Sequence, residues 1–382
     1  MQFHNLSDVP RLTEKESSKA PLRILLLADD RHPANAVQNH IDAITNLSVN
    51  HVEVMNPIHS EVGLRLRFSR FDVFLIHYSI FILGEYFLPL QWRKFIIRFN
   101  GFKAQIIQDE YRHINAMKKS MSELGIDAVF SSLGVEVLEK VYSGDMLANT
   151  HFFSCLPGYI PEDNHALNPP DIRSRSFDIV YRGRTLPPNL GRHAKDKRMI
   201  GEQILAASMH YNLTVDIAID EDSRIYGRNW LEFLMSGRAT LGVEGGASIF
   251  DFDGRLEEIV TMYTAIYPHA DFETVWDALL REYEGNIVHK TITPKIFEAI
   301  ASKTALILYP GNYRGILKPD KHYIPLYPDG SNLPDIVERI QNDNYLQELV
   351  DRTYKEIINC PDLSMGFYAK QIDTVLLRNA QS

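Results

Sequence analysis

The sequence lacks the signatures of several common enzyme classes. No G-x-G-x-x-G follows the first apolar run, where LADDRHPA stands instead, and this disfavours a nicotinamide-dependent dehydrogenase. The G-x-x-x-x-G-K-[ST] loop of P-loop kinases and the G-x-S-x-G elbow of many hydrolases are also absent. Hydride transfer, P-loop phosphoryl transfer and serine hydrolysis are therefore not the expected chemistry.

Cysteine is scarce, and long hydrophobic runs are missing. With only Cys155 and Cys360 the chain cannot build a disulfide framework, and this scarcity fits a reducing compartment. One disulfide bond between the two cysteines is the alternative. The polar first residues show no signal-peptide pattern. The most apolar stretch, 71–90, contains two acidic residues, a histidine and a proline, so it does not resemble a membrane span. We expect a cytoplasmic protein.

Basic residues are fewer than acidic ones, 40 against 49, which gives a net charge of −9. Such a balance argues against a surface that grips nucleic acid, so no nucleic-acid partner is expected and any anion site must be local. A length of 382 residues with 45% hydrophobic content predicts two or three domains with real cores.

Short apolar runs separated by longer segments indicate alternating strands and helices. One set comprises 22–28, 73–77, 104–107 and 128–131. A second set begins with FDIVYR at 177–182, continues at 213–219 and 239–243, and closes with TALILY at 304–309. Continuous apolar runs of this kind are typical of buried parallel strands. The predicted fold class is α/β, with two Rossmann-like, doubly wound domains.

A proline-rich stretch at 155–171 marks the boundary between these domains. The predicted organisation is, in chain order, a flexible N-terminal arm at 1–21, an N-terminal domain at 22–160, a C-terminal domain at 172–360, and a C-terminal helix at 361–382 that crosses back to the N-terminal domain.

Cations gather after the first strand of the second domain. The stretch 173–198 holds eight basic and two acidic residues, at the carboxyl end of a strand, where open α/β sheets bind ligands. Arg184 directly follows that strand, and a guanidinium fork suits a phosphate. A solvated basic face is the alternative interpretation.

Two glutamates stand near glycine turns. Thr293 and Pro294 predict a helix start that places Glu298 in the second helical turn, where it could accept hydrogen bonds from ribose hydroxyls or merely face solvent. The loop PGNYRG at 310–315 could bring backbone amides close to a diphosphate. Glu244 ends a strand ahead of two glycines and could face a ligand or belong to a plain turn.

The runs WLEFLMSGRATLGVEGGAS and KIFEAIASKTALILYPG resemble the nucleotide-binding half of GT-B glycosyltransferases, in a divergent family-1-like or CgeB-like group with a retaining, family-4-type donor half. The resemblance implies two domains facing a cleft. It places Glu244 beside the donor sugar and Glu298 on the ribose. It also implies a set of donor diphosphate ligands: Arg184, Arg192, Lys195, Gly311, Asn312, Tyr313 and Arg314. The family's two glutamates lie seven residues apart, whereas here an insertion at about 247–291 separates them.

In the N-terminal domain, His77 and Asp109 follow apolar runs and are candidates to orient or deprotonate an acceptor hydroxyl. A satisfied structural histidine is the alternative for His77. The helix QWRKFIIRF at 91–99 leaves two interpretations open: aromatics packed on the sheet with cations reaching solvent, or peripheral contact with the inner membrane face.

These observations predict a hexosyltransferase that moves a sugar from a nucleotide diphosphate sugar such as a UDP-sugar, as in polysaccharide biosynthesis. The acceptor is unknown: a glycan, a lipid-linked molecule or a small molecule. We expect a metal-independent reaction with no cofactor besides the nucleotide-sugar co-substrate, and the resemblance implies that it retains the anomeric configuration. Two alternatives stay open: a Mg²⁺-dependent haloacid-dehalogenase-like phosphatase that uses DFDG at 251–254, and a non-catalytic nucleotide-sugar-binding protein.

Overall fold

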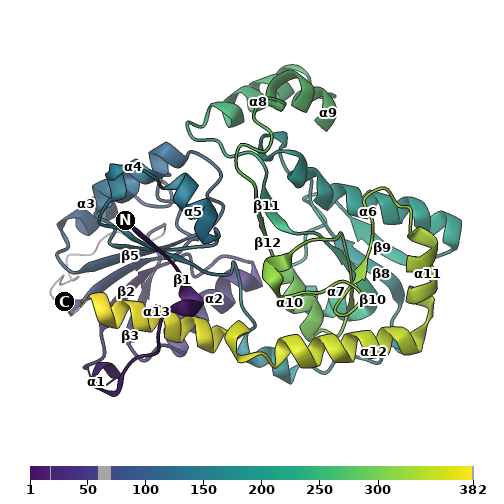
Figure 1. Cartoon of the computed structure of the whole chain (residues 1–382), viewed down its shortest axis with the longest axis horizontal. Coiled ribbons are helices and arrows are strands. Elements are labelled where there is room, and N and C mark those ends of the chain that lie inside the picture. Colours follow the sequence, from purple (N-terminus) through teal and green to yellow (C-terminus); the bar gives the residue numbers. More distant parts are fainter. Residues whose placement is uncertain (18, 59–69, 381–382) are drawn as a thin grey trace. The chain divides into compact units, whose positions relative to one another are not determined.

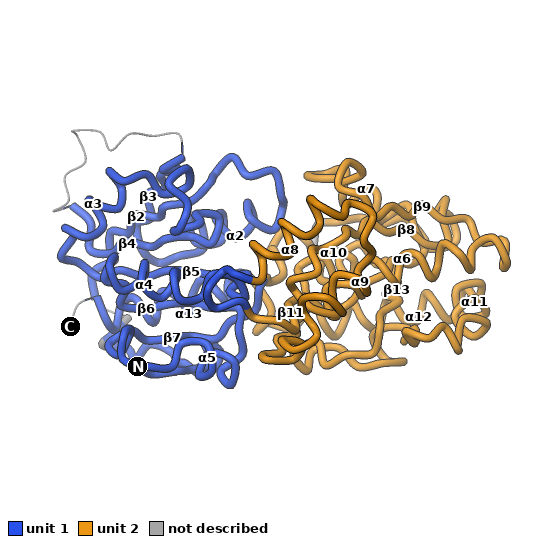
Figure 2. Tube along the Cα trace, turned by 90° about the horizontal axis from the view of Figure 1, so that it is seen from above, with its two compact units in different colours: residues 1–157, 251–255, 365–382 blue, residues 158–250, 256–364 orange. Residues whose placement is uncertain are grey.

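The computed structural model describes residues 1–382 except 18, 59–69 and 381–382. The chain divides into two compact units (Figure 2). Unit 1 comprises residues 1–157, 251–255 and 365–382, and unit 2 comprises residues 158–250 and 256–364. Each unit has its own parallel sheet, and the predicted fold class of two Rossmann-like α/β domains is confirmed.

Unit 1 is built on a seven-stranded sheet of order β1-β7-β6-β5-β4-β2-β3, in which every pair is parallel. Its strands are β1 (Gln2–Asn5), β2 (Arg23–Leu27), β3 (His51–Met55), β4 (Val73–Ile76), β5 (Phe102–Ile107), β6 (Ala128–Ser131) and β7 (His151–Ser154). Its helices are α1 (Glu14–Ser17), α2 (Asn35–Asn46), α3 (Leu90–Arg98), α4 (Ile114–Leu124), α5 (Val135–Val141) and α13 (Met365–Asn379) (Figure 1). The strands that the apolar runs predicted lie in the middle of the sheet, where both faces are covered.

The first residues of the predicted flexible arm over 1–21 form a strand. Gln2–Asn5 forms the edge strand β1, which pairs with β7 and places the ring of Phe3 5.4 Å from that of Phe152. The following Leu6 is buried. A polar, exposed edge strand has no apolar run, so sequence patterning does not reveal it.

Helix α13 is anchored to unit 1 by a buried carboxylate. Asp373 accepts hydrogen bonds from Ser48 Oγ at 2.7 Å, Val49 N at 2.8 Å and Asn50 Nδ2 at 2.7 Å. Farther along the helix, Arg378 Nε donates to Glu16 Oε1 at 2.8 Å. These contacts fix the last helix against segments more than 300 residues away in sequence.

Unit 2 is built on a five-stranded parallel sheet of order β14-β13-β10-β8-β9. Its strands are β8 (Phe177–Arg182), β9 (Val215–Ala218), β10 (Gly237–Gly242), β13 (Ala305–Leu308) and β14 (Ile324–Pro325). Its helices are α6 (Arg192–Tyr211), α7 (Arg228–Ser236), α10 (Pro294–Ala301), α11 (Leu333–Gln341) and α12 (Asp343–Thr353). The strand order reverses between β8 and β10, and the carboxyl ends at such a switch point are where these folds bind ligands.

The segment between β10 and α10 opens and closes with an antiparallel pair, β11 (Gly245–Ala247) and β12 (His289–Thr291). Between them lie α8 (Arg255–Ile266), α9 (Phe272–Val275) and a helical turn at Trp276–Leu280, which share a small core of their own. We call residues 256–288 the insertion. No helix among the described residues combines the length and apolar character needed to cross a membrane.

Replacing Asp373 with alanine is expected to lower the free energy of unfolding by about 2–4 kcal/mol, because three donors lose the buried carboxylate that accepts from them, and one of these donors, Asn50, is itself buried. Calorimetric unfolding checks the magnitude, and faster amide exchange in the 365–379 peptides checks the location. Asp362→Ala, on an exposed residue just before the helix, is the matched control. Equal effects of the two substitutions would contradict this anchoring function.

Candidate functional site

The candidate site lies at the carboxyl ends of β8, β10 and β13. Arg184 follows β8 by two residues, Glu244 follows β10 by two, and the loop 310–315 follows β13. Because these three strands are neighbours and parallel, their carboxyl ends meet at one edge of the unit 2 sheet.

Glu298 is buried in α10 and its carboxylate is held in place. Nε1 of Trp230, in α7, donates a hydrogen bond to Glu298 Oε2 at 2.7 Å, while Oε1 has no hydrogen-bond partner among the described residues. Burial raises the pKa of Glu298, and the Trp230 hydrogen bond and the charge of Lys295 oppose that rise. The second oxygen is therefore available to a hydroxyl donor.

Lys295 stands one turn before Glu298 and is a residue that the sequence interpretation did not single out. Its Nζ lies 5.0 Å from the centre of the Trp230 ring and donates to the backbone oxygen of Arg182 at 3.2 Å. Surrounding protein lowers the pKa of Lys295 by desolvation, and the nearby charges of Arg224 and Arg184 lower it further. The signal available in the sequence was the cation in the first turn of a helix that starts at a Thr-Pro pair.

Arg184 is an exposed guanidinium with no ion pair among the described residues. Its charge acts on Lys295 in the first turn of α10, as does that of Arg224, which is itself paired with Glu221. That helix begins as predicted, with Thr293 as N-cap and Pro294 in the first turn; no side chain caps it, and the Ile296 amide donates to the backbone oxygen of Thr293 at 3.0 Å. Helix amino-terminal amides and converging cations both favour a bound anion.

Glu244 is buried and holds the glycine loop instead of facing open space. Its Oε1 accepts a hydrogen bond from the backbone amide of Tyr313 at 2.8 Å. A Cβ added at Gly311 would lie 2.6 Å from Glu244 Oε2, so only glycine fits against the carboxylate. The prediction that Glu244 lies beside a donor sugar stays untested, while the structure shows it fixing this loop.

The rest of the loop is tightly constrained. Tyr313 is fully buried and its hydroxyl donates to the backbone oxygen of Tyr309 at 2.7 Å. Tyr313, Arg314 and Gly315 have successive φ angles of 47°, 58° and 75°, a left-handed run that is costly for the first two. Asn312 is exposed and Arg314 is half-buried near His289. The loop is therefore preformed.

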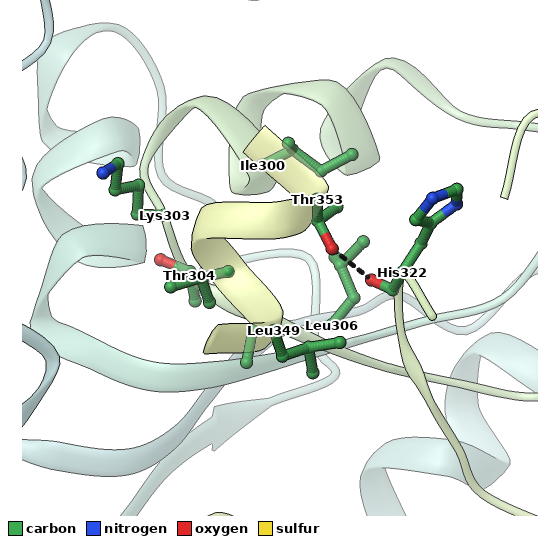
Figure 3. A pocket seen from close by; sticks show the side chains of 9 residues that line it. Ile300, Lys303, Thr304, Leu306, His322, Leu349 and Thr353 are labelled. Atoms are coloured by element: carbon green, nitrogen blue, oxygen red, sulfur yellow. Dashed lines mark hydrogen bonds between the residues drawn. The ribbon is translucent and has the colours of Figure 1, made fainter. Parts of the chain in front are cut away.

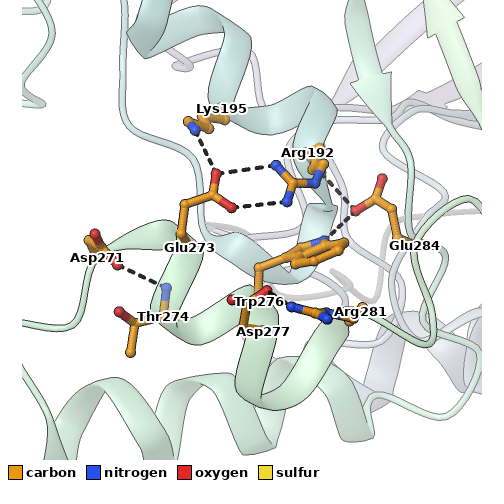
Figure 4. A network of polar contacts seen from close by, with 9 residues as sticks. All are labelled: Arg192, Lys195, Asp271, Glu273, Thr274, Trp276, Asp277, Arg281 and Glu284. Atoms are coloured by element: carbon orange, nitrogen blue, oxygen red, sulfur yellow. Dashed lines mark hydrogen bonds and ion pairs between the residues drawn. The ribbon is translucent and has the colours of Figure 1, made fainter.

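Two of the predicted diphosphate ligands form ion pairs within unit 2 instead (Figure 4). They are Arg192 and Lys195. Glu273 of the insertion accepts from Arg192 Nη2 at 2.9 Å and from Lys195 Nζ at 2.7 Å. The Arg192 guanidinium also lies 4.0 Å from the centre of the Trp276 ring. Both cations attach the insertion to α6, a long-range partnership that sequence spacing does not reveal.

His77, a predicted catalytic residue in unit 1, is fully buried. The Ser79 amide donates to His77 Nδ1 at 3.1 Å, so the ring hydrogen belongs on Nε2, which lies 2.9 Å from His40 Nδ1. The Ser79 hydroxyl in turn accepts from the amide of Asp29 at 2.9 Å. His77 therefore positions the loop after β2 through Ser79, and its proposed function in catalysis stays a prediction.

Asp109, the other predicted catalytic residue of unit 1, is exposed just past β5. Its φ of 58° places it in the left-handed region, and Tyr111 Oη donates to its Oδ1 at 2.8 Å. Strained residues of this kind cluster at functional sites. The neighbouring Glu110 is buried against Ser131 and Tyr142, and burial raises its pKa to about 8.

The DFDG segment does not have the geometry of a phosphatase site. Asp251 is buried, its Oδ1 accepts the amide of Gly254 at 2.9 Å, and its own amide donates to the backbone oxygen of Tyr111 at 2.9 Å. Asn115 Nδ2 donates to Asp253 Oδ1 at 2.6 Å. The segment forms an Asp-Gly turn within unit 1 before α8, an arrangement that does not favour the phosphatase alternative.

A cavity in unit 2 lies at the other end of β13 (Figure 3). Thr304, Leu306, His322 and Thr353 are among its lining residues, and Thr353 Oγ1 donates to the backbone oxygen of His322 at 3.1 Å. Its volume of about 10 Å³ holds roughly one water molecule. It is too small to be a sugar or nucleotide site.

No protein-family model matches the chain, and no curated protein matches its sequence. Solved structures do match. T4 phage BGT in complex with its UDP-glucose substrate aligns with a TM-score of 0.52 at 11% identity, over 94% of this chain and 99% of that one. An alpha-glucosyltransferase in complex with UDP-glucose and DNA containing an abasic site aligns with a TM-score of 0.54 at 10% identity, over 94% and 100%. The chain therefore has the fold of GT-B glycosyltransferases.

Acid is expected to destabilise unit 1 through the buried histidine pair. Burial lowers the pKa of His40 from 6.5 to about 3 and that of His77 well below its usual range. The unfolded chain therefore takes up these protons first, so stability is complete above pH 6.5 and falls as the pH drops towards the folded values. Between pH 7 and pH 5 the loss that His40 contributes is about 2 kcal/mol, and His77 adds to it in the same direction.

Urea unfolding at the two pH values measures this loss. His40→Asn is expected to reduce it by about 2 kcal/mol, whatever the variant's stability at pH 7. His269→Asn, at an exposed position of the insertion, is the control and keeps the full loss. An unchanged pH dependence in His40→Asn would show that the pair does not govern acid sensitivity.

Proposed function

We propose that this protein is a glycosyltransferase that moves a sugar from a nucleotide diphosphate sugar to an acceptor bound by unit 1. The observation that carries the proposal is the arrangement around the first turn of α10. There the cations Arg184 and Lys295 and the buried carboxylate of Glu298 gather at the switch point of a Rossmann-like sheet. Two solved structures with the same fold contain UDP-glucose, which supports this donor class.

Each part of a nucleotide diphosphate sugar has a counterpart among these residues. The diphosphate binds Arg184, Lys295 and the α10 amides, which stabilise the negative charge that develops as it leaves. A ribose hydroxyl donates to the unpartnered Oε1 of Glu298. The backbone of the Gly311 loop, held by Glu244, completes the anion site.

In the reaction, the bond between the anomeric carbon and the diphosphate oxygen breaks, and a bond to the acceptor oxygen forms. The nucleoside diphosphate carries away the electron pair, and the acceptor proton passes to a base. Asp109 is the carboxylate of unit 1 proposed to orient the acceptor hydroxyl or take this proton. Fixed cations replace a bound metal in this scheme, and retention of configuration rests on the family resemblance alone.

Arg184→Ala and Lys295→Ala are each expected to weaken UDP binding tenfold to a hundredfold, because each removes a charge-assisted contact with the diphosphate. Isothermal titration with UDP measures this, without added metal and with EDTA. Arg228→Ala is the matched control, since Arg228 is an exposed cation of α7 paired with Glu232. Arg192→Ala is likewise expected to bind UDP as the parent does.

Parent-like UDP affinity in both Arg184→Ala and Lys295→Ala would refute the proposed donor site. Turnover is a separate question, answered by release of UDP from UDP-glucose and other UDP-sugars. Tight UDP binding without any turnover or transfer would instead support the non-catalytic alternative.

Two substitutions separate the possible functions of Glu244. If its carboxylate holds the loop, Glu244→Gln keeps an acceptor for the Tyr313 amide and is expected to change UDP affinity less than threefold, while Glu244→Ala loses about tenfold. If Glu244 instead acts on the donor sugar, Glu244→Gln abolishes transfer and leaves UDP affinity intact. Parallel titration and transfer assays distinguish the two outcomes.

A further inference from the structure

The outer face of α3 in unit 1 combines exposed apolar and basic side chains. Its inner face is apolar and buried: Trp92, Phe95 and Ile96 pack inward, with the Phe95 ring 5.3 Å from that of Phe74. The aromatics of this helix therefore belong to the core. Leu90 and Ile97, 51% and 50% exposed, point away from that core.

Exposed aromatic residues also lie in the turn that leads into α3. Phe81 is 39% and Tyr86 is 68% exposed. The turn is attached to the helix by Arg93, whose Nη1 donates to the backbone oxygen of Ile82 at 2.6 Å. We call Phe81, Tyr86, Leu90, Lys94, Ile97 and Arg98 the α3 face.

The cations of this face are uncommitted. Lys94 and Arg98 are exposed and have no ion pair among the described residues. The nearby carboxylate of Glu123, in α4, is instead shared between Arg93 at 3.6 Å and Lys119 at 3.9 Å. Glu85 is the one exposed acid within the turn itself. The face is therefore apolar with a positive excess, in a chain whose net charge is −9.

Another exposed apolar stripe, on α8 of the insertion, has the opposite charge. Ile259, Met262 and Ile266 recur there at helical spacing and are exposed, next to the acidic Glu257 and Glu258. An anionic surface would repel this stripe. It therefore serves as an internal comparison, an exposed apolar stripe of opposite charge.

We propose that the α3 face binds the surface of an anionic lipid bilayer. Its apolar and aromatic side chains enter the headgroup region, and Lys94 and Arg98 lie against lipid phosphates. Charge complementarity selects this occupant, because each Lys or Arg near an anionic surface contributes about 1 kcal/mol. Binding of this kind is peripheral, reversible and weakened by salt. It does not require that the protein transfer sugars.

Flotation of the full chain with vesicles tests this proposal. Vesicles of phosphatidylcholine with about 30% phosphatidylglycerol are expected to carry the protein, and pure phosphatidylcholine vesicles to carry at least tenfold less. Lys94→Glu/Arg98→Glu and Leu90→Glu/Ile97→Glu are each expected to lower the partition coefficient at least tenfold. The controls are Met262→Glu on α8 and Lys140→Glu on α5, both exposed, and they are expected to bind as the parent does.

Three results would overturn the proposal. One is absence of parent binding to the anionic vesicles. Another is loss of binding in Met262→Glu with retention in the α3 variants. The third is a combined result: the parent is a dimer in light scattering, the α3 substitutions dissociate it, and the vesicles carry no protein. The α3 face would then join two copies of the chain.

Discussion

The hydrogen bond from Trp230 to Glu298 is the interaction on which the proposed site depends. It fixes a buried carboxylate whose other oxygen has no partner among the described residues, next to a lysine that lies over the same indole ring. Burying a carboxylate costs several kcal/mol, so a core that needed only stability would have an apolar residue there. A ligand hydroxyl that donates a hydrogen bond to Oε1 would explain why a carboxylate is buried at this position. Because the carboxylate is already held in place, it need not reorganise when the ligand binds.

Within each unit, buried polar side chains hold loops in place, while other charged side chains lie exposed at the ends of strands. In unit 2, Glu244 holds the glycine loop by accepting a hydrogen bond from the Tyr313 amide. In unit 1, His77 holds the loop after β2 through Ser79. Arg184 and Asp109 are instead exposed at carboxyl ends of strands. Exposed charged groups on rigid scaffolds are where ligand chemistry is found, while the buried polar groups supply position.

The fold could be predicted from the sequence because buried parallel strands are continuous apolar runs, as in β2, β8 and β13. Local signals also located the start of α10 and the cation after β8. Partnerships across the chain could not be predicted. Glu273 is 81 residues from Arg192, and Tyr313 is 69 residues from Glu244, so nothing in the local pattern shows that these side chains meet. Burial of His77 likewise depends on α2, which supplies His40.

A crystal structure of the protein soaked with UDP would test the central claim most directly. The account requires the diphosphate in contact with Arg184 and Lys295 and a ribose hydroxyl within hydrogen-bond distance of Glu298 Oε1. A nucleotide bound elsewhere on the chain, or one whose ribose does not touch Glu298, would contradict it.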